Sequence, residues 1–125
     1  MIGIIAALAT FATVAIDPGH SRSQAIQAEP AWRMSYVETV RCAGLTQAVS
    51  ELAGGESPEG RALYDVALFW SLTAIQAAAA QGRDEALSDN DQTRARVLAV
   101  RQLTTDDAEA LETLARCRTR TPDLD

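Results

Sequence analysis

The chain has 125 residues, which is enough for one domain and too short for two of ordinary size. Hydrophobic residues make up 47% and charged residues 22%, a globular composition that excludes a disordered or collagen-like protein. The formal net charge is −6. Because a nucleic-acid-binding protein needs a positive surface against the phosphates, we expect no nucleic acid partner.

The first segment of the chain is apolar and resembles the core of a signal peptide. No charged side chain occurs from Met1 to Ile16, and Asp17-Pro18-Gly19 then interrupts the helix. Such a helix rises about 24 Å, which is short of the roughly 30 Å hydrocarbon layer of a membrane. Small residues at positions 23 and 25 suit cleavage after Ala25. We therefore predict a signal peptide over residues 1–25 and a periplasmic or secreted mature protein.

The charges around this segment leave alternatives open. No Lys or Arg precedes the apolar core, whereas Arg22 and Arg33 follow it, which is opposite to the usual arrangement of an exported segment. The segment is then either an uncleaved membrane anchor or a buried helix of a cytosolic bundle. Contact with a membrane is expected only if the segment is retained.

After an irregular lead-in over residues 26–34, the first helix begins at a capping box. The Ser35 hydroxyl and the Glu38 carboxylate stand three residues apart, as reciprocal capping of a helix start requires. Gly54 is expected to end this helix.

A second helix is predicted from Ser57-Pro58 to about Gln81, with a serine cap and a proline in its first turn. Its side chains are apolar on nearly every face. Since an all-round apolar helix is usually surrounded by other helices, we expect it to lie at the centre of the fold.

Two further helices complete the predicted fold. The third is expected to be capped by Ser88 or Asp89, and the fourth by the segment 104–107, ending before Pro122. No alternating pattern typical of strands occurs. The sequence therefore predicts an all-α fold, a small antiparallel four-helix bundle over residues 35–118 with a flexible tail over 119–125.

The two cysteines fall on helices that are neighbours in such a bundle. Cys42 lies in the first helix and Cys117 in the last turn of the fourth. We predict a disulfide between them, which would stabilise the fold by about 4 kcal/mol through the long loop that it closes. The alternative is a pair of buried free thiols.

Catalytic and metal-binding motifs are absent from the sequence. The only histidine, His20, falls in the predicted signal peptide, so the mature chain would lack the partner that most nucleophiles and zinc sites use. Asp89-Asn90-Asp91 lacks the glycine and glutamate that would continue an EF-hand loop. We expect no cofactor, no metal and no enzymatic activity. A small enzyme that uses carboxylates and arginines, such as Asp65 with Arg61, is the less favoured alternative.

Four aromatic residues are candidate interface positions if they are exposed: Trp32, Tyr36, Phe69 and Trp70. Packing inside the bundle is the simpler role for each of them. The function expected from the sequence is non-enzymatic. It consists of binding an unidentified protein partner, or a second copy of the chain, through an apolar helix face.

Overall fold

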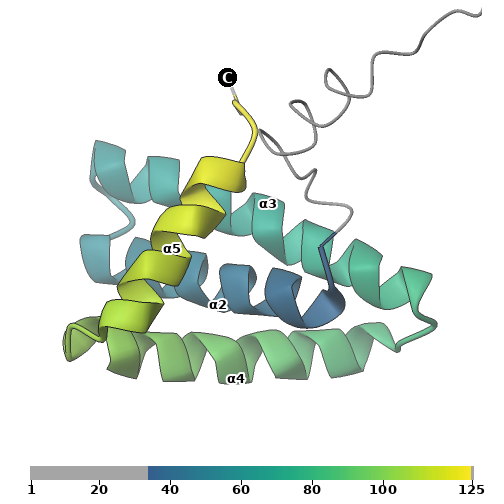
Figure 1. Cartoon of the computed structure of the whole chain (residues 1–125). Coiled ribbons are helices and arrows are strands. Elements are labelled where there is room, and N and C mark those ends of the chain that lie inside the picture. The colour runs from purple at the N-terminus through teal and green to yellow at the C-terminus, as the bar shows by residue number, and fades with distance from the viewer. Residues whose placement is uncertain (1–33, 125) are drawn as a thin grey trace, which may run out of the picture.

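The structure, a computed structural model, describes residues 34–124, which form four α-helices and no strand. They are α2 (Tyr36–Ala53), α3 (Pro58–Ala80), α4 (Glu85–Thr104) and α5 (Ala108–Arg120) (Figure 1). The prediction of an all-helical fold is therefore confirmed for this part of the chain. The predicted signal peptide and, apart from Met34, the lead-in lie outside the described residues.

Side-chain caps fix the starts of these helices. Ser35 Oγ accepts a hydrogen bond from the Glu38 N–H, and the Glu38 carboxylate accepts one from the Ser35 N–H, which is the predicted capping box. The side chains of Ser57 and Asp107 likewise accept from backbone N–H groups in the first turns of α3 and α5. The predicted starts of these three helices are confirmed.

The predicted start of the third helix is wrong. The cap of α4 lies four residues earlier than Ser88, because the Asp84 carboxylate accepts from the Ala86 N–H and the helix begins at Glu85. Ser88 is instead buried within α4, where its hydroxyl accepts a hydrogen bond from Gln92 Nε2. Gly82, which has φ of +69°, ends the preceding segment and leaves only a short connection before Asp84.

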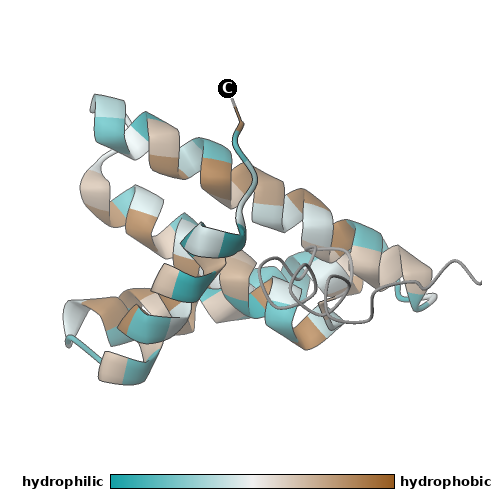
Figure 2. Cartoon of the chain, turned by 45° about the horizontal axis from the view of Figure 1, so that its top comes forward, coloured by the Kyte–Doolittle hydropathy of each residue, from teal (hydrophilic) through white to brown (hydrophobic). Residues whose placement is uncertain are grey.

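Helix α2 lies between α3, which runs antiparallel to it, and α4, which runs parallel to it, and α5 crosses the others steeply (Figures 1 and 2). The expectation that α3 would be central is therefore wrong. The fourth helix contacts the first, as the cysteine pairing required, but it crosses the first helix instead of running alongside it (Figure 1). Small residues on α2 (Ala43, Gly44 and Ala48 are fully buried) let neighbours approach it from several sides, while α3 keeps Leu68 and Leu72 exposed.

The core consists of two apolar clusters, to both of which α5 contributes residues. One surrounds Trp70, which is fully buried and whose Nε1 donates a hydrogen bond of 2.9 Å to Thr121 Oγ1. The other joins α2, α4 and α5 around Leu45, Leu103 and Leu114. Every buried side-chain nitrogen and oxygen of the described residues has a hydrogen-bond partner, so the polar groups that enter this core are satisfied.

Cys42 and Cys117 lie at disulfide distance, the pairing predicted from the sequence. Their sulfur atoms are 2.03 Å apart and their Cα atoms 5.5 Å apart, across a sequence separation of 75 residues. The bond ties the middle of α2 to the last turns of α5 beside Trp70.

Replacing Gly44 by alanine should destabilise the fold, because α2 and α4 touch at this position. A Cβ at Gly44 would lie 2.6 Å from the carbonyl carbon and the Cβ of Ala95. We expect Gly44→Ala to lower the free energy of unfolding by about 1 to 3 kcal/mol, as measured by chemical denaturation. The matched control is Gly55→Ala, where a Cβ would meet nothing within 4 Å. Equal stability of the two variants would contradict the close approach.

Removing the disulfide should lower stability by about 4 kcal/mol, since it closes a loop between residues 75 positions apart. The measurement is the denaturation midpoint of the wild-type chain with and without reductant. In a Cys42→Ser, Cys117→Ser variant, reductant should change nothing. A wild-type midpoint that does not respond to full reduction would show that the bond is absent or does not constrain the unfolded chain.

Candidate functional site

The aromatic residues that the sequence nominated as interface candidates pack inside the fold where the structure describes them. Tyr36 is 4% exposed and Trp70 is fully buried. Phe69 is half-buried, with its ring edge-on to that of Trp70 at a centroid distance of 5.2 Å. Trp32 lies outside the described residues. Tyr36, Phe69 and Trp70 therefore form no exposed aromatic patch.

Tyr36 joins the start of α2 to α4 and to the α3–α4 connection. Its hydroxyl donates a hydrogen bond of 2.8 Å to Asp91 Oδ2, and the Arg83 guanidinium lies 4.6 Å from the centre of its ring. Burial raises the pKa of the Tyr36 hydroxyl above its ordinary value, and the hydrogen bond to the Asp91 carboxylate adds to the rise. These contacts hold the neighbouring helices together at the beginning of α2.

A buried polar cluster links α2, α3 and α4 farther along. Gln92 is 4% exposed, and its Oε1 accepts hydrogen bonds from Ser71 Oγ at 2.8 Å and from Gln47 Nε2 at 3.3 Å. Its Nε2 donates to Ser88 Oγ. The sequence analysis missed Gln92, because nothing in the local pattern distinguishes a buried glutamine from an exposed one.

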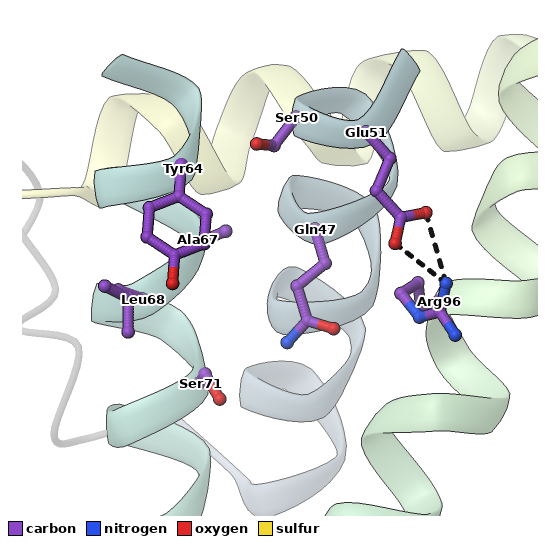
Figure 3. A pocket seen from close by; sticks show the side chains of 8 residues that line it. All are labelled: Gln47, Ser50, Glu51, Tyr64, Ala67, Leu68, Ser71 and Arg96. Atoms are coloured by element: carbon purple, nitrogen blue, oxygen red, sulfur yellow. Dashed lines mark hydrogen bonds and ion pairs between the residues drawn. The ribbon is translucent and has the colours of Figure 1, made fainter. Parts of the chain in front are cut away.

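An open cleft of about 330 Å³ lies over α2, between the first half of α3 and the second half of α4. Figure 3 shows Tyr64 and Leu68 on one wall, and the ion pair between Glu51 and Arg96 on the other. Its lining residues are Gln47, Ser50, Glu51, Tyr64, Ala67, Leu68, Ser71 and Arg96.

The charged pair on the wall of this cleft is partly open to solvent. Arg96 Nη1 lies 2.8 Å from Glu51 Oε1, and the two side chains are 34% and 51% exposed. Because both groups are partly open to water, the solvent screens their attraction, and the ion pair adds little to the stability of the fold.

The residues named for the alternative enzyme do not meet in this cleft. Arg61 and Asp65 are both exposed on α3, and neither lines the cleft. Asp89-Asn90-Asp91 lies within α4. Over residues 34–124, no group of three or more His, Cys, Asp or Glu side chains is placed to hold a metal ion.

The outer face of α3 is an exposed apolar surface that continues over several turns without a charged residue. Three large side chains on this helix are strongly exposed, namely Tyr64 at 56%, Leu68 at 43% and Leu72 at 55%. No charged residue occurs from Val66 to Gly82, and apolar residues recur along the whole of α3 (Figure 2). We define the outer face of α3 by its exposed residues Arg61, Tyr64, Asp65, Leu68, Leu72, Gln76 and Ala79.

Helix α3 is also the one described helix that is long and apolar enough to cross a bilayer. One side of α3 nevertheless packs on α2 through Leu63, Ala67 and Trp70, so these properties are also those of a core helix in a globular fold.

No protein-family model, no curated protein and no solved structure matches this chain. Inference about its role therefore depends on the geometry of the described residues. The cysteine pair at disulfide distance is consistent with an oxidising compartment.

The raised pKa of Tyr36 predicts a loss of stability in alkali. The unfolded chain releases the tyrosine proton near pH 10, before the folded chain does, so the stabilisation is complete below pH 10. It is lost as pH rises from there through the higher pKa of the folded state. We expect the free energy of unfolding to fall in this window, measured by denaturation at several pH values.

Tyr36→Phe should make this decline shallower, whereas Tyr64→Phe, at an exposed position, should leave it unchanged. A decline of the same slope in the wild type and in both variants would contradict the assignment to Tyr36.

Proposed function

We propose that the protein is an exported, non-enzymatic helical protein that binds a protein partner through the outer face of α3. The observation that carries the proposal is the exposure of Leu68 and Leu72 in the middle of a helix segment without charged residues. Full burial of an exposed leucine is favourable by roughly 1.5 to 3 kcal/mol. Leu68 and Leu72 each still expose about half of their surface, so covering both favours association.

The other peripheral helices support this choice by contrast. On α4, three large apolar side chains are also exposed (Leu87, Val97 and Leu98), but exposed charged residues stand among them (Asp89, Arg94 and Arg101). On α5, an exposed ion pair joins Glu112 to Arg116. Charged side chains on an exposed helix face favour contact with water over contact with a partner. A helix face that has no charged residue over several turns is typical of the core of an interface.

Two observations support export to the periplasm or the exterior. Residues 1–25 combine an apolar segment of the length found in signal peptides with small residues at positions 23 and 25. Cys42 and Cys117 lie at disulfide distance, and disulfides persist in oxidising compartments. If the segment is retained instead, it anchors the same binding domain at a membrane. Amino-terminal sequencing of the native protein distinguishes these two forms.

A charged residue in the outer face of α3 should release the partner. We expect the wild-type protein, in a detergent-free extract of the cells that produce it, to elute from size exclusion as a species larger than one chain. Leu72→Glu should elute as a single chain, since a buried carboxylate without a partner is costly. The readout is the elution volume of each variant, detected with an antibody.

The matched control is Leu98→Glu, because Leu98 is equally exposed, at 52%, but lies on α4. This variant should elute like the wild type. Elution of the wild type as a single chain, or an equal effect of both substitutions, would refute binding through α3.

A further inference from the structure

We infer that the partner on the outer face of α3 is a second copy of this chain, whose own α3 lies antiparallel across it. This inference rests on the proposed function and names the occupant of the same face. The arrangement of the exposed residues along α3 carries it.

Four exposed residues form a nearly straight line along α3. Successive residues of an α-helix are 100° apart, so Arg61, Leu68, Leu72 and Ala79 fall within about 40° of one another around the helix axis. The line is symmetric about position 70. Leu68 and Leu72 lie at equal distances on either side of it, as do Arg61 and Ala79. An antiparallel pair centred at this position therefore places Leu68 opposite Leu72 of the second copy, and the reverse.

Charge complementarity favours the antiparallel direction. The last turn of α3 carries no basic residue, and the guanidinium of Arg83, the first cation after it, lies over the Tyr36 ring. The partial negative charge at the end of α3 therefore has no cation of its own helix. In the antiparallel pair, Arg61 of each copy lies beside Ala79 of the other, within this last turn. A parallel pair would instead place the two Arg61 side chains together. The small Ala79 side chain leaves room for the aliphatic part of the arginine.

The residues flanking this line complement one another in the same arrangement. Tyr64 and Ile75 share one edge of the face, and Asp65 and Gln76 share the other. A two-fold axis keeps each edge on its own side, so Tyr64 faces Ile75 of the second copy. On the other edge, the Asp65 carboxylate faces the Gln76 amide, which can donate a hydrogen bond to it. Such isologous contacts are the usual basis of two-fold homodimers.

An exchange of charge tests this register. Arg61→Glu places a carboxylate beside the terminal carbonyl groups of the other α3, and Ala79→Lys places an ammonium beside Arg61. We expect each single variant to raise the dimer dissociation constant about tenfold, because each contact occurs twice. The double variant should return to within about threefold of the wild type, because the new carboxylate at position 61 then faces the new ammonium at position 79.

The measurement is sedimentation equilibrium of the protein as isolated from the cells that produce it. Both single substitutions suit the dipole of their own helix, so circular dichroism should show the helical content of the wild type for every variant. Additive weakening in the double variant would overturn the antiparallel register.

Different experimental results would contradict the second copy and the proposed function. A purified wild-type protein that is monomeric at every concentration, while its native complex in the extract is larger and is lost in Leu72→Glu, overturns the second copy and leaves the proposed function standing. Monomeric protein that sediments with phosphatidylcholine and phosphatidylglycerol vesicles identifies a lipid surface and overturns both. A dimer that dissociates with Leu72→Glu and is restored by the double variant supports both.

Discussion

The close contact of α2 with α4 at Gly44 is the constraint on which the rest of the structure depends. Because residue 44 has no side chain, the backbone of α4 at Ala95 approaches α2 closely enough to bury it. Helix α2 then supplies contacts in several directions, with Cys42 towards α5 and Gln47 towards α4. Its two buried threonines donate hydrogen bonds to carbonyl groups of their own helix, so their hydroxyl groups are satisfied without water.

This central position of α2 determines what remains exposed on α3. Helix α3 packs mainly against α2, and it buries the side that carries Leu63, Trp70 and Ala74. Its composition, however, is apolar well beyond that side. The outer face of α3 is therefore a surplus of apolar surface that the described domain does not use, which is the physical argument for association through it.

The sequence analysis succeeded where the determinants are local. Capping at Ser35 and Ser57 depends on residues three positions apart, and the cysteine pairing needed only two helices lying close together. It failed where tertiary packing decides: an apolar pattern shows how much surface a helix must cover but not which neighbour covers it, so α3 was wrongly placed at the centre. The sequence analysis named Ser88 or Asp89 as the cap of α4 and missed Asp84, because aspartate and serine cap equally well and the local pattern does not rank them. The cluster around Gln92 arises only when three distant segments meet.

The proposed interface is preorganised by the same contacts that close the core. At the level of its centre, Trp70 is fully buried on the opposite side of α3, and its indole donates a hydrogen bond to Thr121 just after α5. Thr121 in turn donates to the carbonyl group of Cys117, which the disulfide ties to α2. A partner that binds an already fixed helix loses little conformational entropy on that side, so a larger share of the leucine burial appears as affinity. In this way cysteine oxidation, the anchoring of Trp70 and the presentation of α3 are physically linked.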